Sequence, residues 1–90
     1  MTRYLVSVDD DWEEPPLILE SARRHRVEEA DMLHALRFAS HEIRQDDEMA
    51  MVIGPDRSGH TLIEVGVVIW WGGELAIAHA YRPARTKYLR

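Results

Sequence analysis

The run from Thr61 to Trp71 constrains the fold most, because it is rich in β-branched and aromatic residues. Alternation along a strand would place one set of its side chains on a single face, namely Ile63, Val65, Val67, Ile69 and Trp71. Gly72-Gly73 then predicts a tight hairpin turn into a second strand from Glu74 to Tyr81. In that strand, alternation predicts a shared face for Leu75, Ile77, His79 and Tyr81. Gly66 indicates a bulge or the close approach of another backbone.

Further strands are expected on the N-terminal side of this hairpin. Met49 to Gly54 is short and apolar, and the turn-rich segment from Pro55 to Gly59 follows it. Arg3 to Val8 alternates well enough for an optional strand, whereas the polar segment from Arg44 to Glu48 predicts a loop or the entry to a strand. The last three strands would therefore form an antiparallel meander.

Two helices are expected before the meander. Pro16 suits the first turn of a short helix from Leu17 to Arg24. A second helix would begin near Glu28, where carboxylates favour the positive end of the helix dipole, and would end between Phe38 and Glu42. Its apolar stripe recurs at steps of four, three and four residues, at Met32, Leu36, Ala39 and Ile43. The predicted class is α+β, with two N-terminal helices packed on an antiparallel sheet of three to four strands.

The length of 90 residues predicts a single domain over 1–90, with an N-terminal strand and acidic loop at 1–15 and a basic tail at 79–90. The chain has no cysteine, which excludes a disulfide, a thiolate zinc site and a cysteine nucleophile. We find no signal peptide and no apolar stretch long enough to span a bilayer, so a soluble, cytoplasmic protein is expected.

Charge divides the chain unevenly. The net charge is −5, but residues 1–48 hold 13 acidic and 6 basic groups, whereas residues 49–90 hold 3 acidic and 5 basic groups. The last twelve residues carry four cations and no carboxylate. This end is either an interaction surface or a solubilising tail. Any contact with nucleic acid should therefore be local to the sheet and this tail, because the chain as a whole is acidic.

The C-terminal segment holds the side chains best suited to chemistry. From His79 to Arg90 it interleaves basic and aromatic groups, which can bind phosphates and stack on bases. His79 could move a proton near neutral pH, or it could be a strand histidine packed beside Leu75, Ile77 and Tyr81. The five histidines show no metal-binding spacing, and the turn from Gly54 to Gly59 lacks the ending of a phosphate loop, so no metal or cofactor is expected.

Several segments resemble small bacterial toxin-like proteins of the RelE/BrnT type, the type II toxins that act as mRNA interferases. They are Met51 to Gly59, Leu62 to Val65, Leu75 to Ala80 and Arg85 to Leu89, with the helix junction Arg24 to Ala30 upstream. The resemblance implies a curved sheet and a metal-independent endoribonuclease that acts on messenger RNA. It also implies an antitoxin as partner, in a toxin–antitoxin hetero-oligomer.

The resemblance also implies roles for individual residues. His79 would be the general acid or base, Arg85 and Arg57 would hold phosphate, Lys87 would stabilise charge, and Tyr88 would stack or donate a proton. Arg82 and Tyr81 would complete the RNA-binding surface. Two alternatives remain open: an inactive relative that binds RNA or protein, and an interaction domain that dimerises through an edge strand or through Trp70 and Trp71.

Overall fold

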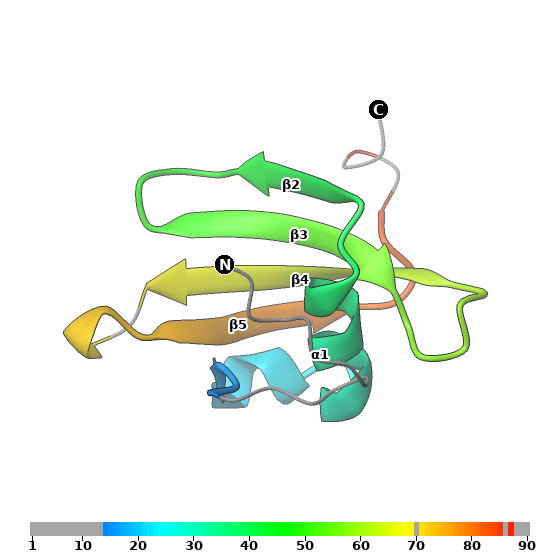
Figure 1. Ribbon diagram of the computed structural model, residues 1–90, viewed down its shortest axis with the longest axis horizontal. Helices are drawn as coiled ribbons and strands as arrows, with labels where there is room; N and C mark the ends of the chain where they lie inside the picture. The colour runs from blue at the N-terminus through cyan, green and yellow to red at the C-terminus, as the bar shows by residue number, and fades with distance from the viewer. Residues whose placement is uncertain (1–13, 70, 86, 88–90) are drawn as a thin grey trace.

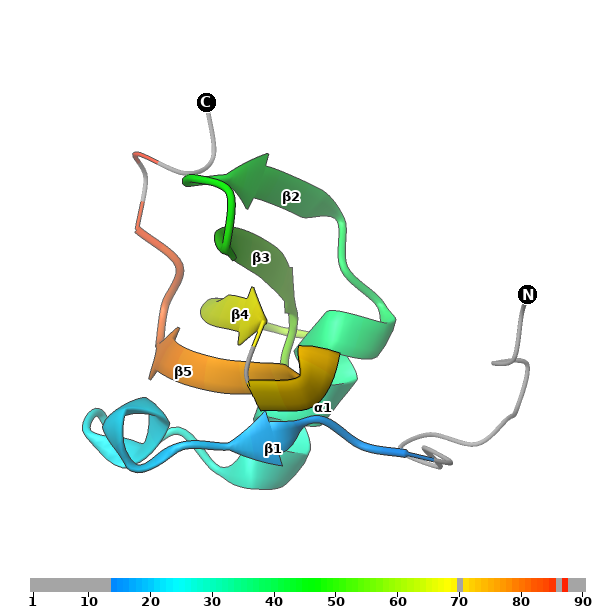
Figure 2. The same ribbon diagram turned by 90° about the vertical axis from the view of Figure 1, so that its left-hand side faces the viewer.

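The computed structural model describes residues 14–69, 71–85 and 87. Its elements are, in chain order, β1 (Leu17–Ile18), the 3-10 helix η2 (Glu20–Arg23), α1 (Glu29–Arg37), β2 (His41–Arg44), β3 (Met49–Pro55), β4 (Leu62–Ile69), the 3-10 turn η3 (Trp71–Gly73) and β5 (Leu75–Tyr81). Five strands form one sheet in the order β1-β5-β4-β3-β2 (Figures 1 and 2). β1 pairs with β5 in parallel and the other pairs are antiparallel, so the sheet is mixed. The expected α+β class is confirmed.

The prediction of two helices is wrong, because the segment expected to form the first one divides into β1 and η2. Leu17 and Ile18 lie beside Ala76 and Ile77 of β5, and Leu19 N–H donates to the Ile77 carbonyl at 2.9 Å. A helix of eight residues gains little from its own hydrogen bonds, so pairing with an open sheet edge outweighs it. α1 is therefore the one α-helix among the described residues.

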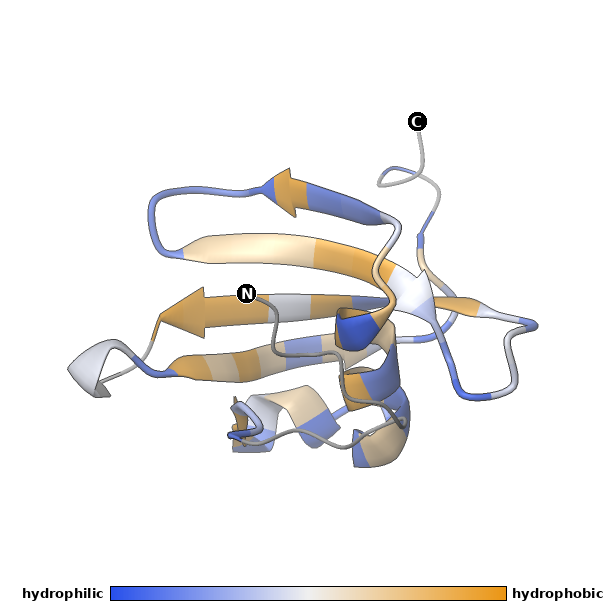
Figure 3. Ribbon diagram, viewed as in Figure 1, coloured by the Kyte–Doolittle hydropathy of each residue, from blue (hydrophilic) through white to orange (hydrophobic). Residues whose placement is uncertain are grey.

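The prediction of three to four strands is also wrong, since β1 and β2 raise the number to five. Ile43 was expected on the stripe of the second helix but lies in β2. α1 ends at Arg37, and Ser40 N–H donates to the Ile53 carbonyl, which brings the chain beside β3. The expected strand at Arg3 to Val8 lies outside the described residues. β3, β4 and β5 are mainly apolar and β2 is largely hydrophilic (Figure 3).

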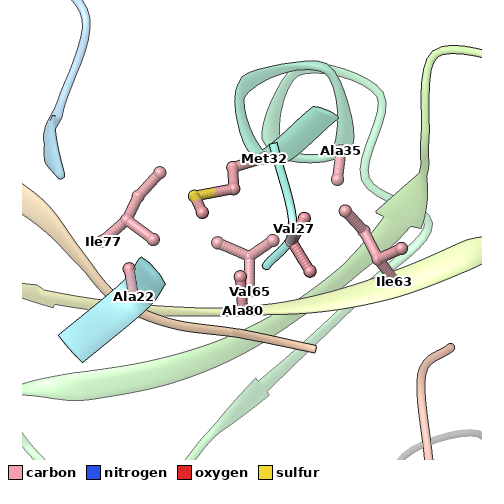
Figure 4. Packing of buried hydrophobic residues seen from close by; sticks show 8 residues of the cluster. All are labelled: Ala22, Val27, Met32, Ala35, Ile63, Val65, Ile77 and Ala80. Carbon is pink, nitrogen blue, oxygen red and sulfur yellow. The ribbon is translucent and has the colours of Figure 1, made fainter. Parts of the chain in front are cut away.

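The main core lies between α1, η2 and the face of the sheet that they cover. Its buried members are Ala22, Val27, Met32, Ala35, Ile63, Val65, Ile77 and Ala80 (Figure 4). The predicted shared face of Ile63, Val65 and Val67 is thus confirmed. Gly54 brings α1 onto the sheet, because a Cβ there would lie 2.1 Å from the Ala35 carbonyl oxygen.

A smaller apolar cluster lies on the opposite face of the sheet. Met51, Ile53 and Ala84 are its buried members, and Ile43 and Met49 pack against them. Ala84 follows β5 and is held there by its N–H, which donates to the Leu62 carbonyl at 2.8 Å. The segment after β5 therefore folds back over this face. Among the described residues, no helix has the length and apolarity needed to cross a membrane.

Candidate functional site

A β-bulge in the β4–β5 ladder decides which side chains of β5 face the core. Gly66 pairs with His79 and Val67 pairs with Ile77, so Ala78 is an extra residue on β5. Ile77 and Ala80 are both in the main core, whereas His79 and Tyr81 lie opposite Gly66 and Glu64 on the other face. The predicted common face of Leu75, Ile77, His79 and Tyr81 is therefore wrong beyond Ile77. The bulge expected from Gly66 is confirmed.

Gly66 makes room for the site on that face. A Cβ at this position would lie 3.1 Å from the Cβ of His79 and 2.7 Å from the terminal methyl of Met49. Its missing side chain thus lets His79 lie close to β4, beside the next residue on the same face of that strand, Glu64.

Glu64 is a carboxylate with no solvent exposure in the middle of β4. Its Oε1 accepts the backbone N–H of Arg85 at 2.8 Å, and both of its oxygens accept the Arg85 Nε–H, at 3.2 and 3.1 Å. Arg85 Nη2 also donates to Oε2, which lies 2.9 Å from Nε2 of His79. A buried carboxylate is tolerated when it is paired and hydrogen-bonded, and Glu64 meets both conditions.

These contacts determine the protonation of the pair. Burial raises the pKa of the Glu64 carboxyl, but the hydrogen bonds from Arg85 and His79 outweigh that effect and hold the pKa below its ordinary value. Glu64 is therefore ionised at neutral pH and can only accept hydrogen bonds, so His79 must carry its proton on Nε2. In neutral His79, Nδ1 is then the nitrogen that can take up a proton.

Aromatic rings surround this pair, and we call Glu64, His79, Arg85, Tyr81 and His25 the Glu64 cluster. The Arg85 guanidinium lies 5.0 Å from the centre of the Tyr81 ring. His25, which follows η2, makes edge contacts with Tyr81 and His79 at centroid distances of 4.8 and 5.9 Å. The cluster therefore holds a carboxylate, a guanidinium, two imidazoles and a phenol.

The Ser21 hydroxyl holds η2 in this position. It donates to the carbonyl of the extra residue of the bulge, Ala78, at 2.6 Å. Ala78, which puts His79 on the other face of the sheet, therefore also binds the segment that carries His25.

A second polar group joins the start of α1 to the ends of β3 and β5, and we call it the Asp31–Asp56 network. Asp31 accepts from Arg57 Nε at 2.8 Å and from Arg82 Nη2 at 3.0 Å. Asp56 accepts from the other Arg82 nitrogen, Nη1, at 2.5 Å, and Arg57 also pairs with Glu28. Three carboxylates thus surround two guanidinium groups.

Both aspartates in this network are nearly buried. The hydrogen bond from the Ser58 hydroxyl has the largest effect on the pKa of Asp56 and lowers it. Burial raises this pKa and the bond from Arg82 lowers it, so the net change is from 3.8 to about 2. For Asp31, burial raises the pKa and the bonds from Arg57 outweigh it, so the net shift is downward. Arg57 and Arg82 therefore act as the counter-ions of buried carboxylates.

The structure brings together three of the predicted site residues, His79, Arg85 and Tyr81, in the Glu64 cluster. It places Arg57 and Arg82 in the Asp31–Asp56 network instead. Lys87 is exposed beyond β5. Tyr88, Trp70 and the side chain of Trp71 lie outside what the structure describes.

Sequence reasoning missed Glu64 and His25. Glu64 is the only charged residue between Leu62 and Ile69, and a lone carboxylate inside an apolar strand is a signal, since it must find a partner if it is buried. His25 had no such signal, because its neighbours in space come from a strand more than fifty residues away. The alternative of a strand histidine beside Leu75, Ile77 and Tyr81 holds for Tyr81, whose ring stacks on that of His79 at a centroid distance of 6.5 Å. It is wrong for Leu75 and Ile77, because the bulge puts His79 on the other face.

No group of three or more metal-ligating side chains occurs among the described residues. In comparisons with known protein families, with curated proteins and with solved structures, nothing matches this chain.

Proposed function

We propose that this chain is a RelE-like type II toxin that cleaves messenger RNA without a metal ion, at the Glu64 cluster. The observation that carries the proposal is the buried Glu64 carboxylate, which binds a histidine and an arginine that both reach solvent. The side chains of His79 and Arg85 are 24% and 44% exposed, whereas that of Glu64 is fully buried. A ligand can therefore touch the imidazole and the guanidinium but not the carboxylate.

The proposed reaction begins at the ribose 2′-hydroxyl. His79 Nδ1 takes the hydroxyl proton, because Nε2 is held by Glu64. The 2′-oxygen then attacks the adjacent phosphorus and forms a 2′,3′-cyclic phosphate as the bond to the 5′-oxygen breaks. Arg85 stabilises the negative charge that develops on the phosphate oxygens. Protonated His25, whose ring contacts that of His79, donates a proton to the leaving 5′-oxygen.

Glu64 acts in this scheme as a positioning residue. It holds the His79 tautomer and the Arg85 guanidinium, and its charge stabilises the imidazolium that forms when His79 takes a proton. Tyr81 lies beside both groups and offers a ring on which a base can stack. Lys87 and Tyr88 remain predicted contributors from the tail.

The test is cleavage of RNA by the purified full chain in EDTA, with detection of a 2′,3′-cyclic phosphate end. His79→Ala should lower the rate by about 100-fold or more, the usual contribution of a general base. His60→Ala is the matched control, because His60 is an exposed histidine in the turn between β3 and β4. RNA that stays intact at high protein concentration, or equal rates for the two variants, would contradict the proposal.

A second candidate function is binding without cleavage, as an inactive relative that serves as an RNA- or protein-binding module. It is favoured by the engagement of Arg57, Arg82 and Arg85 with carboxylates in a chain of net charge −5. It predicts salt-sensitive RNA binding with no product. Arrest of growth on expression, relieved by a co-expressed antitoxin, would favour the toxin instead.

A further inference from the structure

β2 is the last strand of the sheet, at the edge opposite β1 (Figure 2). His41, Glu42 and Arg44 are exposed in it, and Ile43 is half-buried. Within the described part of the chain, neither Glu42 nor Arg44 has a side-chain hydrogen bond or ion pair. A strand with an open edge presents unpaired N–H and C=O groups to any other strand.

The hydrogen bonds around β3 identify which residues of β2 face outward. Asp56 N–H donates to Thr61 O and Ile69 N–H donates to Glu48 O, so even-numbered residues of β3 face β4. Odd-numbered ones must then face β2, and the bond from Gln45 N–H to Met49 O at 2.8 Å agrees. By the same alternation, Glu42 and Arg44 direct their backbone N–H and C=O groups away from β3.

The side chains of β2 match this backbone pattern. Glu42 and Arg44 line a groove of about 350 Å³ on the α1 side of the sheet, whereas Ile43 packs with Met51 and Ile53 on the other side. If a second β2 lies antiparallel with Ile43 opposite Ile43, each Glu42 lies opposite an Arg44. The backbone N–H and C=O groups of both residues point away from β3, so each of these pairs can exchange two backbone hydrogen bonds.

We propose that two copies of this chain pair through β2 in this register to form a symmetric dimer. The strand is complementary to itself in backbone pattern, in charge and in the position of its one apolar side chain. The two five-stranded sheets would then join into one continuous sheet. The two-fold axis would be perpendicular to this sheet, so both copies of α1 would lie on the same side of it. This inference is independent of the proposed endoribonuclease activity.

A second copy is favoured over a foreign strand because this register pairs Glu42 of each copy with Arg44 of the other. In a foreign strand, the residues opposite Glu42 and Arg44 would need complementary charges of their own. The pairing is short and its ion pairs are exposed, so the dimer should be weak and should weaken further with added salt.

Charge reversal gives a sharp test by sedimentation of the full chain across a range of concentrations. Glu42→Arg puts an arginine opposite Arg44 at both ends of the paired strands. Arg44→Glu likewise puts a glutamate opposite Glu42 at both ends. Each variant alone should dimerise about tenfold or more weakly than the original chain. An equal mixture of the two should form a heterodimer, and the double variant Glu42→Arg/Arg44→Glu should dimerise again.

Backbone amide exchange supplies a second readout that does not depend on variants. The Glu42 and Arg44 amides should become protected as concentration rises, whereas the Gln45 amide, bonded to Met49, should not change. Circular dichroism should show that each variant keeps the fold. A chain that stays monomeric at millimolar concentration overturns the proposal, as does a Glu42→Arg variant that dimerises normally. Protection at every dilution also overturns it, because another segment of the same chain would then cover the edge.

Discussion

The three central strands, β3, β4 and β5, present different kinds of side chain on the two faces of the sheet. On the α1 face, Ile63, Val65 and Ile77 are fully buried and the backbones of α1 and β3 touch at Gly54. On the opposite face, the same strands present Glu64, Gly66, His79 and Tyr81. One face is closed by apolar packing, and the other keeps ionisable groups within reach of water. The exposed ionisable side chains of the central strands are therefore found on the second face, beside the buried Glu64.

The Asp31–Asp56 network and the Glu64 cluster also differ in the side chains that they contain. The Asp31–Asp56 network surrounds two arginines with three carboxylates. The Glu64 cluster has one carboxylate, one arginine and two histidines. The first therefore acts as a fixed clamp between α1 and the strands, while the second places two imidazole rings beside a buried carboxylate and its arginine.

The largest effect should come from adding a methyl group on each face. Gly54→Ala would place its Cβ against the backbone of Ala35, which cannot move without shifting α1, so it should lower the free energy of unfolding by more than about 3 kcal/mol. Gly66→Ala meets the flexible end of Met49 and the Cβ of His79, and should lower it by only about 1–2 kcal/mol. Denaturant unfolding checks both, and equal losses would contradict the contrast between the faces.

A smaller effect should follow from neutralising the buried carboxylate. Glu64→Gln keeps the shape of the side chain but turns one acceptor into a donor facing Arg85 and His79. We expect the free energy of unfolding to fall by about 2–3 kcal/mol, since a buried pair is broken while the remaining cation still reaches water. The control is Glu74→Gln, an exposed glutamate, which should change it by less than about 0.5 kcal/mol. Matching losses for the two variants would show that Glu64 is not a structural counter-ion.

The Asp31–Asp56 network should make the fold sensitive to acid. The pKa of Asp56 is lowered in the fold from 3.8 to about 2, so its stabilising contribution is complete above the ordinary value. That contribution, about 2 kcal/mol, should be lost as pH falls from about 4 to 2. Denaturant unfolding at several pH values should show a shallower acid slope for Asp56→Asn than for Asp47→Asn, an exposed control. Identical slopes would rule out this role.

The strands of the meander were predictable because β-branched runs and glycine turns are local signals. β3 and β5 end within one residue of their expected bounds, and β4 lies inside the expected run. β1 and β2 were not predictable, since each is short and is defined by pairing with a strand distant in sequence. Ile43 fitted the helical stripe by spacing, yet the α-helix ends at Arg37 and Ile43 packs on the far side of the sheet.

The site was predictable only in part, for the same physical reason. His79, Tyr81 and Arg85 drew attention as a basic and aromatic segment, and they do meet in space. Which carboxylate each arginine binds could not be read from charge alone, because Arg57 and Arg82 bind aspartates on α1 and in the turn after β3, whereas Arg85 binds Glu64. Glu64, the residue that organises the cluster, had a signal in its apolar neighbours, but its partners Arg85 and His79 could not be read from the sequence, because they lie 15 or more residues away.

Ala78 has a consequence for how this chain tolerates changes in length. Because it is the unpaired residue of the bulge, its deletion would leave every residue on either side of it on its present face. Deleting a residue of β3 or β4 would instead exchange inside and outside along the rest of that strand. What deletion of Ala78 would remove is the carbonyl that binds Ser21. The sheet can therefore exist without the bulge, but the segment that bears His25 would lose its hydrogen bond to β5 at Ser21.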